Sequence, residues 1–133
     1  MARHEATSEF SVSSWDEQPY RERSDAPKLT MAEVVQTYTG SLTGTSEIRY
    51  LMLYPDNGVT TFTGIESFAG SLDGRDGALA IRWNGADDGT AARGVGTIIP
   101  GSATGALAGI SGDASYEAGR SGEVTMSLSY ELA

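Results

Sequence analysis

Residues 47–69 read EIRYLMLYPDNGVTTFTGIESFA, and this stretch decides the fold class. Side chains of different character alternate on both sides of the PDNG sequence at residues 55–58, which is the pattern of β-strands. Proline presets φ for the turn and Asn-Gly tolerates positive φ, so these four residues predict a tight turn. The stretch is therefore expected to be a β-hairpin.

Similar patterns recur along the chain, separated by turns rich in glycine. The expected strands are 9–14, 28–39, 47–54, 59–69, 78–84, 92–99, a short strand at Tyr116, and 123–132. About eight short strands with no convincing helix predict an all-β fold, a single antiparallel up-and-down barrel over residues 9–133. A β-sandwich is the alternative. Residues 1–8 are expected to be a flexible N-terminal tail.

The composition excludes several functional classes. The chain has 133 residues, no cysteine and a net charge of −9. Without cysteine there is no disulfide, no thiolate nucleophile and no cysteine-based metal site. The negative charge argues against nucleic acid as a partner. No apolar stretch approaches the roughly 20 residues of a membrane span, so no membrane partner is expected. Residues 1–9 carry no apolar signal segment, which predicts a cytoplasmic protein.

Several short motifs together resemble the DUF3224 family of small bacterial proteins. They are WDEQPY at 15–20, YLM at 50–52 followed by Tyr54, GIE at 64–66, GSLDGR at 70–75 and PGSATG at 100–105. The resemblance extends over nearly the whole chain, from Phe10 to Tyr130. It implies a barrel of the allene-oxide-cyclase-like, calycin-like type, some members of which are cofactor-free cyclases and isomerases of hydrophobic substrates.

Two positions depart from that family pattern. Arg82-Trp83 stands where members often have Gln-His, and Ala103 stands in the middle of a motif that is often Gly-Ser-Gly-Thr-Gly. The first departure could reshape a pocket, so this chain need not share the ligand of its relatives.

Glu66 is the first candidate for a catalytic residue. It alternates with Phe62 and Phe68, so all three side chains should share one face of a strand. If that face lines the lumen, the carboxyl lies in an apolar cavity and could act as a general acid or base. The alternatives are that this face is exterior, or that Arg49 or Arg82 pairs with Glu66. Tyr50 is the second catalytic candidate.

An aromatic wall around a ligand is the second expected feature of the lumen. Pockets for small molecules are mostly apolar with a few polar groups. The candidate substrate-binding residues are Trp83, Tyr54, Phe62, Phe68, Met52 and Tyr38. Ordinary core packing is the alternative role for these side chains.

Metal and cofactor chemistry is not expected. His4 is the single histidine and lies in the expected tail, which excludes a Ser-His-Asp triad or a multi-histidine metal site within one chain. The Asp87-Asp88 pair lies in a turn pattern and lacks the spacing of a calcium-binding loop.

Three functions remain open for such a barrel. The first is a cofactor-independent cyclase or isomerase acting on a small polyketide-like or lipid-like substrate, since an apolar lumen could hold a flexible molecule in a reactive shape. The second is a non-catalytic carrier or sensor of a small hydrophobic molecule. The third is an interaction protein whose barrel is filled by its own side chains. Apolar residues on both faces of the 28–39 strand also suggest a homodimer.

Overall fold

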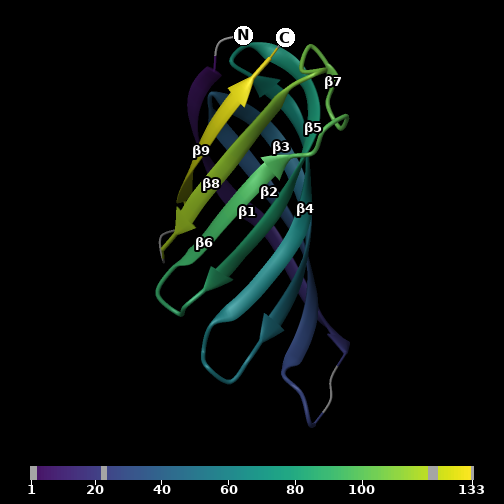
Figure 1. Ribbon diagram of the computed structural model, residues 1–133, viewed down its shortest axis with the longest axis vertical. Coiled ribbons are helices and arrows are strands. Elements are labelled where there is room, and N and C mark those ends of the chain that lie inside the picture. The colour runs from purple at the N-terminus through teal and green to yellow at the C-terminus, as the bar shows by residue number, and fades with distance from the viewer. Residues whose placement is uncertain (1–2, 22–23, 120–122, 133) are drawn as a thin grey trace.

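Eight strands form a closed antiparallel barrel in the computed structural model, which describes residues 3–21, 24–119 and 123–132 (Figure 1). The barrel strands are β1 (Arg3–Arg21), β2 (Lys28–Gly40), β3 (Leu42–Tyr54), β4 (Thr60–Leu72), β5 (Arg75–Asp87), β6 (Ala92–Ile98), β8 (Ser111–Ala118) and β9 (Glu123–Glu131). A short strand, β7 (Thr104–Gly105), lies outside the ring and pairs with β5. Pairing of β1 with β9 closes the ring. The described part of the chain has no helix, and so none that could cross a membrane.

The expected up-and-down barrel is confirmed, and the first strand is longer than expected. β1 begins at Arg3, which pairs with Glu131 of β9, so residues 3–8 form a strand and not a flexible tail. The inward residues of this stretch, Ala6 and Ser8, are small, so the sequence shows little apolar alternation there. Residues 16–21, which lie outside the expected strands 9–14 and 28–39, continue β1. Residues 1–2 lie outside the described residues.

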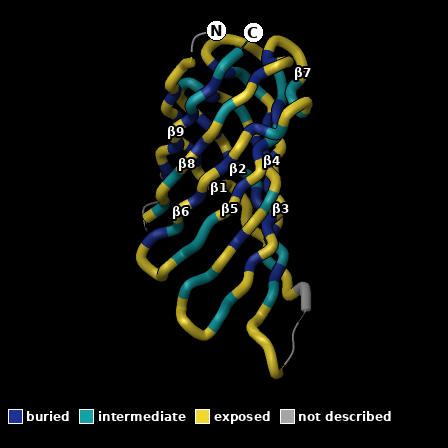
Figure 2. The backbone as a smooth tube through the Cα atoms, viewed as in Figure 1, coloured by how far each residue is buried: buried dark blue, intermediate teal, exposed yellow. Residues whose placement is uncertain are grey.

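The side chains alternate between a buried interior and an exposed exterior along most strands, as Figure 2 shows. This settles which strand face is internal: in β4 it is the face that carries Phe62, Glu66 and Phe68. The main apolar residues of the interior are Phe10, Val34, Tyr38, Ile48, Tyr50, Phe62, Phe68, Leu79, Ile81, Trp83, Met126 and Leu128.

Large and small residues alternate around the inside of the barrel. One row of paired residues crosses β3 to β6 in the order Tyr50, Gly64, Trp83, Gly96. Each aromatic ring thus lies beside a residue without a side chain. A Cβ atom on Gly96 would lie 2.7 Å from Ile81 Cγ2 and 2.8 Å from Trp83 Cε3, too close for either contact. The interior can hold several large rings because the paired positions beside them are glycines, which have no side chain.

One end of the barrel is closed by the segment between β6 and β8. This segment lies at the end where both termini are found (Figure 1). Its side chains Leu107 and Ile110 are 0% and 4% exposed and belong to the same apolar cluster as the barrel interior. The segment is anchored to β5 by a hydrogen bond from Ala106 N to Asp76 O of 2.9 Å. Leu107 and Ile110 thus hold this glycine-rich stretch in place.

The outer wall carries apolar side chains on the face opposite to this core. Leu51, Leu53 and Ile65 are exposed on β3 and β4. They are consistent with apolar residues on both faces of the wall, and the homodimer stays a prediction.

We expect Gly96→Ala to destabilise the fold, because its methyl group would collide with Ile81 and Trp83. The expected loss is about 1–3 kcal/mol, the usual cost of overpacking a core. The matched control is Gly119→Ala, since a Cβ there meets nothing within 4 Å. Urea unfolding of both variants measures the difference, and equal midpoints would contradict the packing argument.

Candidate functional site

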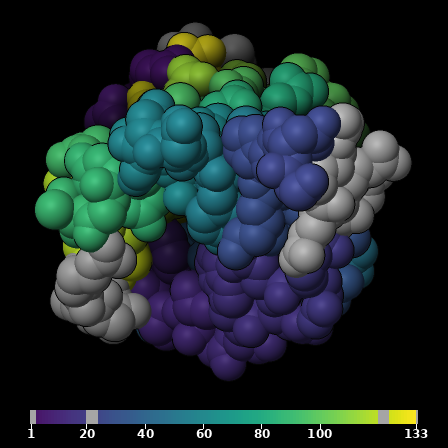
Figure 3. Space-filling view, turned by 90° about the horizontal axis from the view of Figure 1, so that it is seen from below, coloured from purple at the N-terminus to yellow at the C-terminus, as the bar shows by residue number. Residues whose placement is uncertain are grey.

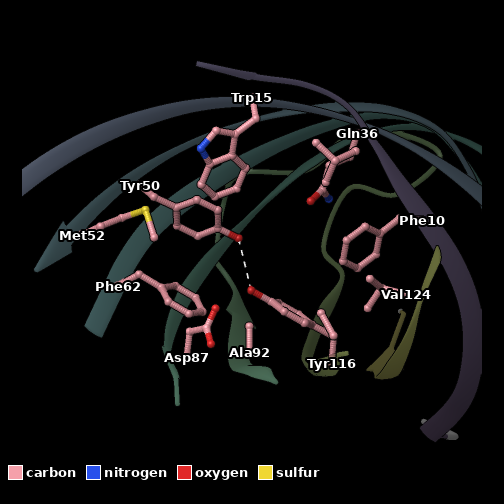
Figure 4. Close-up of a pocket in the computed structure, with 12 residues that line it drawn as sticks. Phe10, Trp15, Gln36, Tyr50, Met52, Phe62, Asp87, Ala92, Tyr116 and Val124 are labelled. Atoms are coloured by element: carbon pink, nitrogen blue, oxygen red, sulfur yellow. Dashed lines mark hydrogen bonds between the residues drawn. The ribbon is translucent and has the colours of Figure 1, made fainter. Parts of the chain in front are cut away.

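An apolar pocket opens at the end of the barrel opposite the termini. We call it the mouth pocket; its volume is about 140 Å³. It is lined by Phe10, Val12, Trp15, Gln36, Tyr50, Met52, Phe62, Asp87, Ala92, Tyr116, Ala118 and Val124. Seen from this end, the surface is hollowed between the teal strands and the purple N-terminal strand (Figure 3). Figure 4 shows the aromatic side chains gathered around the space.

A β-bulge in β1 places two apolar residues at this pocket. Val12 pairs with Gln36 and Ser14 pairs with Val35, so Ser13 is an extra residue in the strand. The extra residue changes which side chains point inward, and both Val12 and Trp15 line the pocket. Trp15 is nevertheless 48% exposed because it stands at the open end. Its ring lies beside that of Tyr50, with the centroids 6.4 Å apart.

Two tyrosine hydroxyls meet across the pocket. Tyr50 Oη and Tyr116 Oη are 3.4 Å apart, as the dashed line in Figure 4 shows. Burial raises the pKa of Tyr50 far above its ordinary value, and burial also raises the pKa of Tyr116 to about 12. Both phenols therefore stay neutral at physiological pH. They can donate a hydrogen bond to a ligand, but they are poor general bases.

Two further polar side chains reach the pocket wall. Gln36 comes from β2 and is 4% exposed. Asp87 stands at the end of β5, where its Oδ1 accepts a hydrogen bond of 2.8 Å from Gly89 N. Of the described residues that line the pocket, none is a lysine, an arginine or a histidine. The wall thus offers an amide, two phenols and one carboxylate to a ligand.

Glu66 lies inside the barrel but behind the pocket wall, and it does not line the pocket. It is 1% exposed. Its Oε2 accepts hydrogen bonds of 2.6 Å from both Tyr38 Oη and Ser46 Oγ, and its Oε1 accepts one of 2.8 Å from Trp83 Nε1. With both oxygens occupied, Glu66 organises the polar centre of the core.

The arginine partners considered for Glu66 are elsewhere. Arg49 lies 3.5 Å from Glu33 on the outer wall, and Arg82 is exposed. Burial raises the pKa of the Glu66 carboxyl, and the hydrogen bonds from Ser46, Tyr38 and Trp83 offset only part of this effect. Because Glu66 is buried inside the barrel and both arginines lie on its exposed outer face, the suggestions that Glu66 faces the exterior or pairs with one of them are wrong.

The structure divides the candidate site residues into two groups. Tyr50, Met52 and Phe62 line the mouth pocket. The other candidates do not: Glu66, Trp83, Phe68 and Tyr38 are buried deeper in the core, and Tyr54 lies outside the lining.

Tyr54 belongs instead to a polar cluster near the end of β1 and the start of β2. Its hydroxyl donates to Glu17 Oε2, and Thr30 Oγ1 donates to the same oxygen over 2.6 Å. Partial burial acts to raise the pKa of Glu17, but hydrogen bonds from Thr30, Tyr54 and Trp15 hold it below its ordinary value. Lys28 Nζ lies 4.5 Å from the centre of the Tyr54 ring. These interactions tie Tyr54 to β1 and β2.

Sequence reasoning missed several lining residues. Trp15 was hidden because a bulge has no clear sequence signature, so its inward direction could not be read from alternation. Gln36 and Tyr116 were visible as members of strands, but nothing in their neighbours marked them as pocket residues. The described residues contain no group of three or more acidic or histidine side chains that could hold a metal ion.

The fold and the pocket define a small up-and-down β-barrel, closed at one end and open at an apolar, aromatic mouth. The chain belongs to the family described as "Protein of unknown function (DUF3224)", whose profile it matches over residues 6–130. The family resemblance seen in the sequence is thereby confirmed. A solved protein of unknown function from the DUF3224 family of Shewanella oneidensis MR-1 is 21% identical, with a TM-score of 0.81 over 99% of each chain. That likeness supports the fold alone. No curated protein matches the sequence.

We expect the pKa of Glu66 to appear in the pH dependence of stability. Because burial raises this pKa above 4.5, the folded protein binds the proton more tightly than the unfolded chain. The unfolding free energy of the wild type, relative to Glu66→Gln, should therefore fall as the pH rises from 4.5 through the folded-state pKa. Urea unfolding of both proteins between pH 4 and about 8 measures this difference.

The matched control for this experiment is Glu47→Gln, the same substitution on the exposed face of the neighbouring strand. The unfolding free energy of the wild type, relative to Glu47→Gln, should not fall over the same pH range. A difference between wild type and Glu66→Gln that stays constant or grows with pH would contradict the raised pKa.

Proposed function

We propose that this protein is a binding protein, a carrier or sensor, for a small hydrophobic molecule held in the mouth pocket. The observation that carries this proposal is the open apolar pocket of about 140 Å³ with Trp15, Tyr50 and Phe62 in its wall. An apolar cavity of about 150 Å³ in another protein is large enough to bind benzene. The pocket therefore accepts one substituted ring, or one end of a longer polyketide-like or lipid-like molecule.

The chemistry of the lining favours binding over turnover. The carboxylate expected to catalyse, Glu66, already accepts hydrogen bonds from Tyr38, Ser46 and Trp83 and is not in the pocket wall. The two phenols are neutral and cannot readily remove a proton. What the wall supplies is a largely apolar surface with few polar groups, which is typical of ligand-binding sites.

A cofactor-independent cyclase or isomerase is the second proposal. The observation that favours it is the pair of hydroxyls of Tyr50 and Tyr116, which could donate to a developing oxyanion on a substrate carbonyl. Asp87 is the carboxylate of the lining that could exchange a proton. The closed eight-stranded ring is consistent with the allene-oxide-cyclase-like, calycin-like class, and that finer assignment belongs to this proposal.

The binding proposal is tested with p-xylene and protein labelled with ¹³C in the methionine methyl groups. Met52 lines the pocket, whereas Met31 lies on the outer face of β2 beside Leu51 and Ile65. We expect a saturable shift of the Met52 methyl resonance, because aromatic ligands perturb nearby nuclei, and no saturable shift at Met31. Shifts of equal size at both methyl groups, or none at all, would overturn the proposal.

A pair of variants sharpens this test. Ala118→Phe should abolish the Met52 response, because its ring would fill the pocket that Ala118 lines. Ala69→Phe is the same substitution on the exposed face of β4 and should leave the response unchanged. Circular dichroism of both variants checks that the barrel is intact.

The second proposal is tested by exchange of the α-protons of 4-methylacetophenone for deuterium. If the hydroxyl pair acts on carbonyls, the wild type should accelerate this exchange about 100-fold or more over a Tyr50→Phe/Tyr116→Phe protein, since one lost oxyanion donor typically costs that much. Equal exchange rates in a folded double variant would remove the pair from any catalytic role. NMR spectroscopy measures both rates.

A further inference from the structure

The orientation of the Gln36 amide is fixed by the polar centre of the core. Its Nε2 lies 3.5 Å from Glu66 Oε2 and 3.4 Å from Tyr38 Oη. The Tyr38 hydroxyl already donates its proton to Glu66, so it can only accept from Gln36. Both neighbours therefore require an N–H donor, which places the amide nitrogen toward the core and the carbonyl oxygen on the other side.

The carbonyl oxygen of Gln36 is left for the mouth pocket. Among the described residues, Gln36 Oε1 has no hydrogen-bond partner, and no side-chain polar atom that is fully buried lacks one. The oxygen therefore lies on the pocket surface. Figure 4 shows the side chain pointing into the space between Tyr50 and Phe10. An acceptor held in an apolar wall favours a ligand that brings a donor.

The tyrosine pair supplies the complementary group. Within the described chain, Tyr50 Oη and Tyr116 Oη have only each other as hydrogen-bond partners. One hydroxyl donates to the other, so one O–H of the pair remains to be donated. Figure 4 shows this pair and Gln36 facing the same space. Apart from the Asp87 carboxylate, the pocket thus presents one donor, from the tyrosine pair, and one acceptor, from Gln36.

The charges around the pocket select against anions. Asp87 is part of the lining, none of the lining residues that the structure describes is basic, and the chain carries a net charge of −9. Among the described lining residues, a carboxylate ligand would find no cation to compensate its charge, and it would lose its hydration. A neutral group that both donates and accepts a hydrogen bond fits Gln36 and the tyrosine pair, and a hydroxyl is the smallest such group.

We propose that the ligand of the mouth pocket is a small, neutral ring that carries a hydroxyl group, of the phenol or enol class. The hydroxyl donates to Gln36 Oε1 and accepts from the Tyr50–Tyr116 pair, while the ring lies among the aromatic side chains. This inference rests on the proposed binding function and adds the chemical class of the ligand.

The test compares p-cresol with p-xylene, in which a methyl group replaces the hydroxyl, and with 4-methylbenzoate. Titrations follow the Met52 methyl resonance of the labelled wild-type protein. Two added hydrogen bonds should make p-cresol bind about tenfold or more tightly than p-xylene. 4-Methylbenzoate should bind more weakly than either.

The outcomes separate the two proposals. If p-xylene binds as tightly as p-cresol, or 4-methylbenzoate binds best, the hydroxyl class is overturned and the binding function stands. If no probe shifts Met52, the binding function falls and the ligand class falls with it.

Gln36→Leu tests the acceptor itself. It replaces the whole amide, both the carbonyl oxygen and the nitrogen that faces Glu66 and Tyr38, with apolar methyl groups, so p-xylene should still bind while the preference for p-cresol falls to threefold or less, about the contribution of one remaining hydrogen bond. An undiminished preference in the folded variant would overturn the role of Gln36. If this variant does not fold, the ranking of the three probes on the wild type decides alone.

Discussion

Aromatic rings placed beside glycines are the constraint on which the rest of this barrel depends. Where Tyr50, Trp83 and Tyr116 point inward, each has a glycine as its paired residue on at least one adjacent strand: Gly64, Gly64 and Gly96, and Gly94, respectively. A ring of eight strands has limited internal room, and uniformly large side chains would not fit. The alternation lets a small interior hold several aromatic rings, and at the open end the same rings leave a pocket.

The interior has a polar centre and an apolar mouth, and one residue connects them. Glu66 gathers hydroxyl, indole and amide donors within the core. The Gln36 amide faces this cluster with its nitrogen and the pocket with its oxygen. A buried carboxylate that looked like a catalyst in the sequence thus lies behind the pocket wall and contacts the Gln36 amide, which is part of that wall. Its burial is matched by hydrogen bonds and not by an opposite charge.

Much of the fold was predictable because its turns contain residues, such as proline and glycine, that strongly favour tight turns. The PDNG turn and the alternation around it correctly indicated the hairpin of β3 and β4. The lumen face could not be chosen from sequence, because apolar residues such as Leu51 and Met52 occur on both faces. Of the candidate site residues, Tyr50, Met52 and Phe62 reached the pocket. Trp15 could not be foreseen, since its direction depends on one extra residue in β1.

The closure of one end by Leu107 and Ile110 has a kinetic consequence. With those side chains buried in the core, the described barrel is a dead end and not a channel. Trp15 is half-exposed at the open end, so a molecule that reached the mouth pocket would approach it from this side. Entry and exit of such a molecule would share this one side, and a change at Trp15, which is itself part of the pocket wall, would affect the affinity as well as the rates.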